Sequence, residues 1–366
     1  MSKQKVATPQ RDELAEVLAE ALNKLVPENK VAFFLDGSEI TPTDLKEFVS
    51  SGATMLDLAM SNRPHGGMPV GRIVELTGLE QSGKSLICAH ILANIQKAGG
   101  VGVLIDTESA VNEEFFTAVG VDWSKLVYVN TEAIEDIFEM MSTIIEKVRK
   151  SSKDRPVCIV VDSVAGASTR SELEGTYNKE GYATDKSIII SRAMRKITNL
   201  LAKQRILVVF TNQLRMKMNA PAFADPYTTS GGKAIGFHAS LRVRLSVIKK
   251  IKQSDKIIGV TIRAKIIKNR IGPPHREAEF DVYFDRGIDD YSSWLKALKE
   301  AKLIKQGGAW YTYGEEKFQS KDFPEFLEKD PERKEELYQK LCEHIIMSYR
   351  RTDDDKEIDF TDAVEE

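Results

Sequence analysis

From about residue 46 to residue 288 the chain alternates between short apolar runs and longer segments with helical periodicity. The runs are rich in β-branched residues and almost uniformly apolar, which is typical of parallel strands covered on both faces. The segments between them repeat apolar residues at intervals of three and four, as amphipathic helices do. This alternation predicts right-handed βαβ units and a mostly parallel sheet. The clearest predicted strands are residues 73–77, 101–106, 157–162 and 206–211.

The pattern changes on both sides of these units. Residues 11–25 carry apolar residues on one face of a predicted helix. A lone helix of this length is marginal in water, so it must pack on this chain's own core or on a neighbouring copy. Residues 241–247 and 259–266 alternate apolar and polar side chains around a polar loop at 252–258. That period of two predicts a hairpin with one solvated, basic face.

After Asp289 the pattern becomes helical again and includes an aromatic stretch at residues 307–313. A last helix is predicted to begin at Asp330, which suits an N-cap, with Pro331 in its first turn. We therefore expect an N-terminal helix and linker at 1–45, an α/β core at 46–288, a small C-terminal domain at 289–350 and an acidic tail at 351–366.

The composition is that of a globular protein. Hydrophobic residues make up 42% of the chain and charged residues 29%, which is enough apolar material for a sizeable core. No stretch approaches the roughly 18 consecutive apolar residues of a transmembrane helix, and the first residues do not resemble a secretory signal. Three cysteines cannot form a disulfide framework or a tetrahedral thiolate zinc site, and five scattered histidines without an HExxH motif argue against a zinc hydrolase. These features favour a cytoplasmic protein.

Charge is unevenly distributed, although the net charge is −3. Residues 351–366 contain eight acids and two bases, whereas residues 242–276 contain eleven Lys or Arg and a single acid, Asp255. Two interpretations are equally open at this point. The basic segment binds a polyanion and the tail competes with it, or the two segments are solvated faces that differ in sign.

Residues 78–85, GLEQSGKS, match the phosphate-binding pattern GxxxxGK[ST]. They follow a predicted strand and open a predicted helix, which is the context that the pattern requires. Backbone N–H groups of the loop and the helix N-terminus would surround the phosphates. Lys84 would hold the β- and γ-phosphates, and the Ser85 hydroxyl would bind Mg²⁺. The remaining predicted nucleotide-binding residues of this loop are Gly78, Glu80, Gln81, Ser82 and Gly83.

Polar side chains at the ends of neighbouring strands complete a site for nucleotide hydrolysis. Asp162 ends an apolar strand, and we interpret it as the acid that completes the Mg²⁺ site, with a helix N-cap as the alternative. Glu108 would orient and deprotonate the attacking water, a role for which Asp106 competes on position alone. An ordinary surface role is the alternative for either residue. Gln213 ends the strand ILVVFTNQ, where its amide would sense the γ-phosphate, although a simple turn residue gives the same pattern.

Together these residues resemble the RecA family of strand-exchange recombinases. Segments LIDTES (104–109), VVDSVAG (160–166) and NQLRMKM (212–218) lie in the family's order and spacing, as does TTSGGKAIGFHASLRVRL (228–245). The resemblance covers roughly residues 46–315. It implies an α/β fold with a P-loop RecA-like core, a mostly parallel sheet, an N-terminal oligomerisation helix and a small α+β C-terminal domain.

The resemblance implies a site for ATP and Mg²⁺ built on the motifs above, with Glu108 as the catalytic base. Phe115 takes the place of a tyrosine that stacks on adenine, so stacking survives without the hydroxyl. Asn112 takes the place of an aspartate near the adenine amino group. In the family's arrangement the residues that serve phosphates, metal and hydrolysis are Lys84, Ser85, Glu108, Asp162 and Gln213.

The resemblance also implies DNA partners. Loops at about 174–184 and 215–232 match the family's two DNA-binding loops. Phe237 matches an aromatic residue that crosses the subunit interface. Lys268 and Arg270 match two basic residues that reach a neighbour's ATP, the second being lysine in the family, so the charge is kept and the geometry changes. Contacts to the DNA are expected from Arg195, Arg215, Lys217, Gly231 and Gly232.

The implied activity is the assembly of helical filaments on single-stranded DNA, followed by pairing and strand exchange with homologous duplex DNA in recombination and repair. ATP would lie between neighbouring copies, and DNA would stimulate its hydrolysis. Base pairing would read the sequence, so the protein would contact mainly the DNA backbone.

Three features depart from the family's pattern. The first loop, TYNKEGYA, differs from the bacterial consensus, and the helix after it carries one extra residue. Gly236 stands where the family has a lysine beside Phe237. These differences are typical of a divergent member, for example a virus-encoded one.

Two other functions use the same core. A hexameric helicase would need an N-terminal primase-binding domain, for which 45 residues are too few. A regulatory adaptor that binds ATP without turnover would usually have lost the base or the loop lysine, yet Glu108 and Lys84 are both present. Among the remaining residues, we expect Cys88 and Cys158 to fill the core. The aromatic residues expected to form the core of the C-terminal domain are Trp294, Trp310, Tyr311 and Tyr313.

Overall fold

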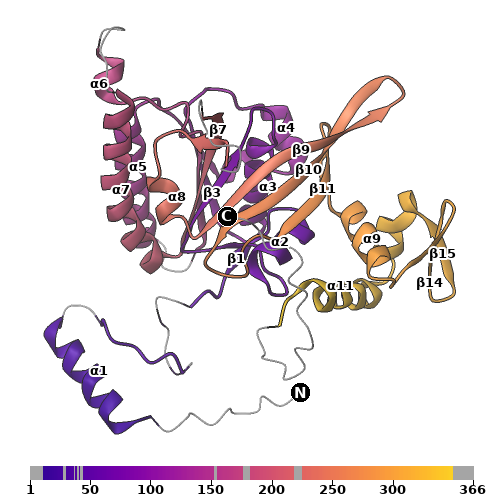
Figure 1. Ribbon diagram of the computed structural model, residues 1–366, viewed down its shortest axis with the longest axis horizontal. Coiled ribbons are helices and arrows are strands. Elements are labelled where there is room, and N and C mark those ends of the chain that lie inside the picture. Colours follow the sequence, from indigo (N-terminus) through magenta and orange to yellow (C-terminus); the bar gives the residue numbers. More distant parts are fainter. Residues whose placement is uncertain are drawn as a thin grey trace. The chain divides into compact units, whose positions relative to one another are not determined.

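Figure 1 shows a computed structural model of the chain. Contacts between residues divide it into two units, residues 1–46 and residues 47–366, and each is described by itself. The predicted acidic tail, residues 176–181 of the predicted first DNA loop and residues 218–224 of the predicted second DNA loop lie outside the described residues. The residues that the structure describes are 11–27, 30–36, 38, 41, 44–151, 155–175, 182–217 and 225–348.

The first unit contains the predicted N-terminal helix, α1 (Glu13–Leu25). The Asp12 carboxylate caps it by accepting a hydrogen bond from the Ala15 N–H at 3.1 Å. Asn23 then accepts hydrogen bonds from the N–H groups of Val31 and Ala32, which ties the returning segment to the helix. No residue of α1 is buried within this unit. Its exposed apolar side chains are Leu14, Val17, Leu18, Leu22 and Leu25.

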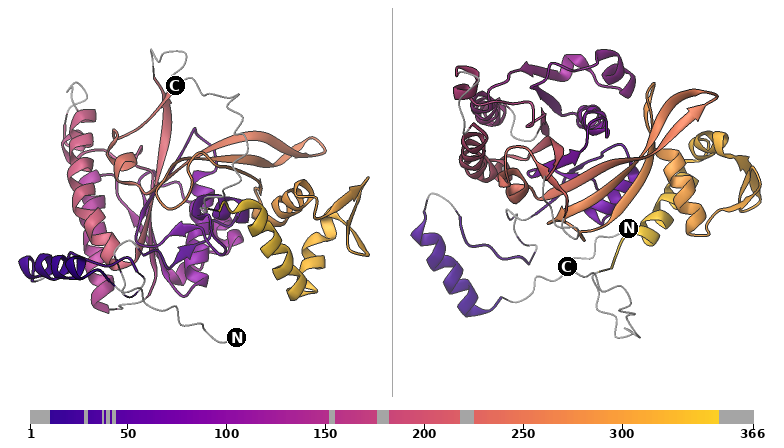
Figure 2. Two further views of the ribbon diagram at one scale, coloured as in Figure 1. Left: turned by 60° about the horizontal axis from the view of Figure 1, so that its bottom comes forward. Right: turned by 45° about the horizontal axis from the view of Figure 1, so that its top comes forward.

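The second unit is organised around a large twisted sheet, shown from three directions in Figures 1 and 2. Its described residues form ten strands in the order β12-β11-β10-β9-β3-β7-β6-β4-β5, with β8 paired to β7. The strands from β9 to β5 in this order are parallel, as predicted. They are β3 (Ile73–Gly78), β4 (Val101–Asp106), β5 (Leu126–Asn130), β6 (Val157–Asp162), β7 (Ile206–Met216), β8 (Tyr227–Thr229), β9 (Leu241–Gln253), β10 (Lys256–Asn269), β11 (Glu277–Tyr283) and β12 (Gly287–Asp289).

Helices cover both faces of this sheet. Consecutive residues face opposite sides, so Val160 packs in the apolar cluster on one face and Val161 in the cluster on the other. Cys88 and Cys158 are buried in the first cluster, which confirms their predicted place in the core. The helices α2 (Thr54–Ser61), α3 (Lys84–Lys97) and α4 (Glu113–Val119) contribute to the first cluster, and α5 (Ile134–Ser151) and α7 (Tyr182–Gln204) to the second. Shorter elements are β1 (Phe48–Val49), β2 (Met68–Pro69), η1 (Trp123–Lys125), α6 (Arg170–Leu173) and α8 (Ala234–His238).

The hairpin of β9 and β10 is longer than its sequence pattern predicted. The expected loop at 252–258 is wrong, because strand pairing continues to Gln253 opposite Lys256 and the chain reverses at residues 254–255. Ser254 takes the positive φ, 53°, that the tight turn requires. Both faces of the hairpin's outer part are solvated, so its residues need no apolar alternation to stay paired. Figure 1 shows this ribbon extending beyond the neighbouring strands.

The C-terminal part packs on the same apolar cluster as α2 and α3. Trp294 is buried, and Tyr311 and Tyr313 pack against the cluster, as predicted. The prediction is wrong for Trp310, which is half exposed. The elements are α9 (Asp290–Glu300), β13 (Lys305–Gly307), β14 (Trp310–Tyr313), β15 (Glu316–Gln319), η2 (Ser320–Asp322), α10 (Phe323–Glu328) and α11 (Pro331–Ile345).

Two aspartates of the C-terminal part, Asp330 and Asp290, cap the first turns of helices. The Asp330 carboxylate accepts hydrogen bonds from the N–H groups of Glu332 and Arg333 at 3.1 Å, which confirms the predicted start of α11. Helix α2 has no cap of its own, because its N-cap residue is an alanine. Instead, the Asp290 carboxylate accepts hydrogen bonds from the N–H and hydroxyl of Thr54, at 2.6 and 2.5 Å. None of the described helices has the length and apolar character needed to cross a membrane.

Candidate functional site

The predicted phosphate-binding loop connects β3 to α3. Gly83 caps α3 with φ at 90°, and a Cβ there would lie 2.4 Å from the Ile262 side chain, so only glycine fits. The Lys84 ammonium lies over the loop and donates hydrogen bonds to the carbonyls of Leu79 at 2.8 Å and Gly78 at 3.3 Å. This arrangement leaves backbone N–H groups at the helix start available for an anion.

Two carboxylates act on Lys84. Burial lowers the pKa of its ammonium, and the negative charges of Asp162 and Glu108 oppose that shift. Lys84 and Glu108 follow β3 and β4, and Asp162 is the last residue of β6. The carboxyl ends of these three strands meet at one edge of the sheet. The structure thus brings together the predicted phosphate lysine, metal acid and catalytic base.

Asp162 is held by hydroxyl groups. Thr211 donates to its Oδ1 at 2.5 Å, and Ser85 also donates a hydrogen bond to it. Burial raises the pKa of Asp162, and these hydrogen bonds oppose the rise. The N-cap alternative is wrong, because the next helix, α6, is capped by Thr169.

The contact between Ser85 and Asp162 fits a Mg²⁺ ion. A hydroxyl and a carboxylate in contact are the oxygen ligands that Mg²⁺ uses beside nucleotide phosphates and water. The described residues contain no group of three or more His, Cys, Asp or Glu side chains placed to hold a metal. A Mg²⁺ ion that takes most of its ligands from phosphates and water does not need one.

Glu108 and Asp106 have different surroundings, which separates the two candidates for the base. Asp106 is buried and accepts hydrogen bonds from the N–H groups of Glu108 and Ala110 and from the Tyr128 hydroxyl. Its carboxylate therefore organises the turn that follows β4. Glu108 is exposed, and its Oε1 accepts a hydrogen bond from the Ser163 hydroxyl at 2.6 Å. Glu108 is thus the carboxylate that is open to water.

Gln213 lies beside the phosphate loop, because β7 pairs with β3 and sets Gln213 opposite Gly78. The prediction that it ends the strand is wrong. Strand β7 continues to Met216, because its last residues pair with β8, which the sequence pattern did not reveal. Both the phosphate loop and the segment toward the predicted second DNA loop therefore adjoin Gln213.

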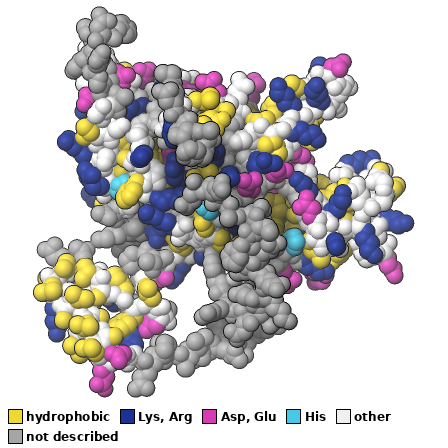
Figure 3. Space-filling view, in the orientation of Figure 1, with side chains coloured by type: hydrophobic (Ala, Val, Ile, Leu, Met, Phe, Trp, Pro, Cys, Tyr) yellow, Lys and Arg dark blue, Asp and Glu magenta, His cyan; other side chains and the backbone are white. Residues whose placement is uncertain are grey.

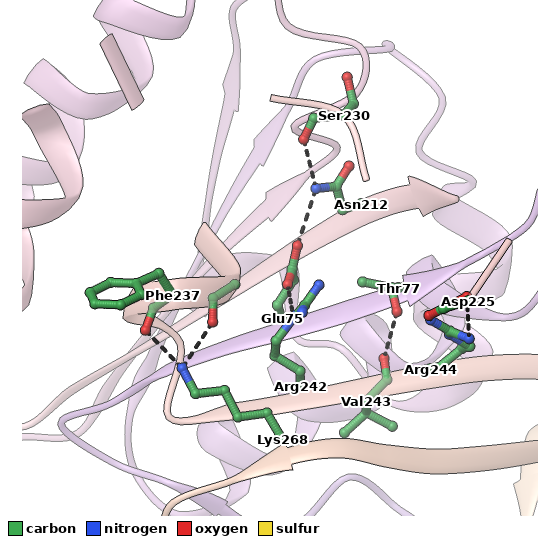
Figure 4. Close-up of polar contacts among 11 residues, drawn as sticks. Glu75, Thr77, Asn212, Asp225, Ser230, Phe237, Arg242, Val243, Arg244 and Lys268 are labelled. Carbon is green, nitrogen blue, oxygen red and sulfur yellow. Dashed lines mark hydrogen bonds and ion pairs between the residues drawn. The ribbon is translucent and has the colours of Figure 1, made fainter. Parts of the chain in front are cut away.

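A buried polar chain crosses three neighbouring strands (Figure 4). The Asn212 amide donates to Glu75 Oε1 at 3.1 Å and to the Ser230 carbonyl at 3.0 Å. Arg242 Nε donates to Glu75 Oε2 at 2.6 Å. A Cβ on Gly236 would lie 2.8 Å from the Arg242 guanidinium carbon. The glycine that departs from the family's pattern thus makes room for Arg242.

Phe237 and the predicted trans-acting cations lie together at the end of α8. The Lys268 ammonium donates to the carbonyls of Gly236 at 2.9 Å and Phe237 at 2.7 Å, and Arg270 donates to the Phe237 carbonyl at 3.5 Å. Phe237 is 70% exposed. Burial lowers the pKa of His238, and so do the charges of the nearby cations Arg195, Lys268 and Arg270. Figure 3 shows Lys and Arg side chains gathered on this face of the core and along the β9–β10 hairpin.

The other predicted ligand residues lie at the surface. Gly231 and Gly232 both have positive φ, 73° and 77°. Arg215 is exposed on β7, and Lys217 donates to the Asp225 carbonyl. Asn112 caps α4 by accepting a hydrogen bond from the N–H of Phe115, whose ring is partly buried in the core. Arg195 donates to the Ser191 hydroxyl.

A parallel sheet with a phosphate-binding loop and two carboxylates beside it at one edge defines the class of P-loop ATPases. The comparisons with known proteins are more specific. Residues 29–289 match the model of the RecA N-terminal domain. The chain is 38% identical to Protein RecA of Sulfurimonas denitrificans over 283 residues, which is 77% of this chain and 78% of that protein. It is 34% identical to Protein RecA of Oleidesulfovibrio alaskensis and 35% to that of Nocardioides sp., each over 82% of this chain and 83% of the relative.

The chain therefore belongs to the RecA family. As a member it is an ATP-dependent recombinase that acts in DNA recombination and repair, and its activity includes DNA-dependent ATP hydrolysis.

Several residues of the site were not predicted. Ser163 contacts the carboxylate of Glu108, and Glu75 and Arg242 join β3 to β9. One signal was available for Glu75, because a glutamate inside the apolar run IVELT must have a partner. No such signal marked Ser163, since a serine after a strand is ordinary.

Proposed function

We propose that this chain binds ATP with Mg²⁺ at the 78–85 loop and assembles as a helical filament on single-stranded DNA. In that filament it pairs the strand with homologous duplex DNA. Lys84 would contact the β- and γ-phosphates, and Ser85 and Asp162 would hold the metal. Bound Mg²⁺ and ATP supply the γ-phosphoryl group and the charge neutralisation that its transfer needs.

Glu108 is proposed as the base that accepts a proton from the attacking water. Its exposed carboxylate and the hydrogen bond from Ser163 support this role, because the bond fixes one oxygen and leaves the other free for water. Gln213 is proposed to report the γ-phosphate to the second DNA loop, since its strand runs from beside Gly78 toward that loop. Phe115 and Asn112 are proposed to contact adenine.

Lys268 and Arg270 are proposed to act on the neighbour's nucleotide. In the strand register, Lys268 of β10 lies opposite Arg242 of β9, and Arg242 lies opposite Glu75 of β3. Glu75 is three residues before Gly78 on β3. Three residues along a strand and two strands across separate the Cα atoms of Lys268 and Gly78 by roughly 14 Å. The Lys268 ammonium is also bound to the Gly236 carbonyl in α8 and not to the phosphate loop. These cations are therefore far from their own phosphate loop and lie beside the exposed Phe237, which suits a subunit contact.

Single-stranded and duplex DNA are the proposed partners. Gly231 and Gly232 present backbone N–H groups without side chains, and Arg195, Arg215 and Lys217 would contact phosphates. Such contacts hold a strand without reading its sequence. Presence of both Glu108 and Lys84 argues against an adaptor that does not turn over ATP.

The observation that carries this proposal is the convergence of Lys84, Asp162 and Glu108. The test compares Glu108→Gln and Lys84→Ala with the exposed control Glu114→Gln. Glu108→Gln should keep ATP binding, lose about 10²-fold or more in hydrolysis, and give long-lived DNA complexes. Lys84→Ala should lose both nucleotide binding and ATP-dependent DNA binding. Normal turnover in either variant, or no strand exchange by the unaltered protein, would contradict the proposal.

A further inference from the structure

Lys186 is a buried lysine that no part of the predicted site accounts for. It lies in the second turn of α7 and is only 8% exposed. Its ammonium donates hydrogen bonds to the backbone carbonyls of Ala165 and Ala167. Burial lowers its pKa, while the charge of Glu172 raises it and that of Arg215 lowers it. A buried charge is retained at such a cost where its hydrogen bonds fix a backbone segment.

The segment that Lys186 fixes is one wall of the proposed catalytic site. Its two acceptor carbonyls flank Gly166, whose N–H donates to the Ser163 hydroxyl at 3.2 Å. The same hydroxyl donates to Glu108 Oε1. A Cβ on Gly166 would lie 2.7 Å from Glu108 Cγ, so the backbone of this segment is packed directly against the carboxylate side chain.

The same turns of α7 touch the end of the second predicted DNA loop. A Cβ on Gly231 would lie 2.6 Å from the Ile190 side chain, and one on Gly232 would lie 2.9 Å from the Ser187 hydroxyl. Lys186 is the neighbour of Ser187 in this helix. The start of α7 therefore contacts the proposed DNA-backbone glycines on one side and the wall of Glu108 on the other.

We propose that Lys186 is a positioning residue that couples DNA contact at Gly231 and Gly232 to the placement of the Glu108 carboxylate. A shift of α7 against the glycines moves the ammonium, and with it the carbonyls of Ala165 and Ala167. Ser163 and Gly166 then carry the shift to Glu108. The coupling rests on the proposed function, because it assumes that Glu108 is the base.

The test removes the hydrogen bonds and keeps the length of the side chain. Lys186→Met should lower the DNA-stimulated kcat for ATP at least tenfold. It should leave the DNA-free rate, the KM for ATP and the affinity for poly(dT) within about twofold of the unaltered protein. Lys186→Arg, which keeps donors and charge, should recover at least a third of the stimulated rate. Lys147→Met, which removes an exposed lysine from α5, is the matched control and should behave as the unaltered protein.

Gly166→Ala tests the same contact from the other side and does not depend on the stability of the Lys186 variant. Its new methyl group would press against the Thr107 hydroxyl and the Glu108 side chain, so the stimulated kcat should fall while nucleotide and DNA affinities persist. Full DNA stimulation in Lys186→Met or in Gly166→Ala would overturn the coupling, and so would a loss of DNA affinity equal to the loss of rate. Failure of the proposed function is distinguished from these outcomes, because the unaltered protein would then show no DNA-stimulated hydrolysis.

Discussion

Arg242 donates a hydrogen bond to the carboxylate of Glu75 at 2.6 Å, and the Glu75 side chain has no exposed surface. The second carboxylate oxygen accepts from Asn212, which in turn contacts the carbonyl of Ser230. One buried charge thus links the strand before the phosphate loop, the strand that carries Gln213 and the end of the second predicted DNA loop (Figure 4).

Replacing Glu75 with glutamine should strongly destabilise the protein. The variant leaves the Arg242 guanidinium without its charge partner in a largely buried place, and breaking such a pair costs about 3–5 kcal/mol. Urea unfolding followed by circular dichroism should show this loss for Glu75→Gln. The exposed control Glu114→Gln should unfold at the same urea concentration as the unaltered protein. Equal midpoints for all three proteins would mean that the pair contributes nothing.

Mixtures of two inactive variants should recover ATPase activity if Lys268 and Arg270 act on a neighbouring copy. Glu108→Gln lacks the base but keeps both cations, whereas the double variant Lys268→Ala/Arg270→Ala lacks the cations but keeps the base. In a mixed filament, some junctions combine an intact base from one copy with intact cations from the next. DNA-stimulated hydrolysis by an equal mixture should reach about a quarter of the normal rate, because random assembly makes one junction in four complete.

The control for this experiment is each variant alone at the same total concentration, where hydrolysis should stay near background. A mixture that remains as inactive as its components, while both variants still form filaments under the electron microscope, would place the cations in their own copy's site. It would also mean that the separation of roughly 14 Å between the Cα atoms of Lys268 and Gly78 does not keep these cations from their own copy's site.

The stability of the second unit should fall as the pH rises from about 5 to about 8. Burial raises the pKa of Asp57 from its ordinary value of 3.8 to about 7, and the nearby charge of Asp290 adds to the rise. The folded protein therefore holds this proton more tightly than the unfolded chain does. The resulting stabilisation is complete below about pH 4 and is lost as the pH passes the folded pKa.

Asp57→Asn removes this titration and should gain stability relative to the unaltered protein at the higher pH. The shift sets a ceiling of about 4 kcal/mol, at about 1.4 kcal/mol for each pKa unit. Thermal melts should be recorded for both proteins at pH 5 and pH 8. The Tm of Asp57→Asn minus the Tm of the unaltered protein should be several degrees larger at pH 8 than at pH 5. The exposed variant Asp322→Asn should show no such movement. A constant difference for Asp57→Asn would mean that Asp57 stays ionised in the folded state.

Local patterns predicted most of the core, and non-local pairing explains what they missed. The runs predicted at 73–77, 101–106 and 157–162 are strands whose observed ends differ from the predicted ends by one residue at most. Their uniformly apolar residues indicate directly that both faces of each strand are buried. Strand β5 was not predicted, because Val127 and Tyr128 are exposed at the sheet edge and give no sign of burial. The extension of β7 to Met216 depends on β8, whose three residues carry no strand signal of their own.

The candidate site divides in the same way. The phosphate loop, Asp162 and Glu108 could be predicted from the sequence, because each is a polar residue or a short contiguous motif at the end of an apolar strand. Asp106 and Glu108 were separated only by the structure, which shows the first tied to backbone N–H groups. Lys186 was not singled out, since an isolated lysine in an amphipathic helix is normally solvated. Its carbonyl partners lie about twenty residues earlier in the chain, and no periodicity joins them.

The capping of α2 by Asp290 has a consequence for shortened versions of this chain. Residue 288 would be a natural place to cut, because the sequence there passes from the sheet to a helical pattern. A fragment that stops at that point would lose the carboxylate that satisfies the first turn of α2, 236 positions upstream. We therefore expect such a fragment to be poorly soluble on expression. Extending it at the C-terminal end to include α9 should improve its solubility more than extending it at the N-terminal end.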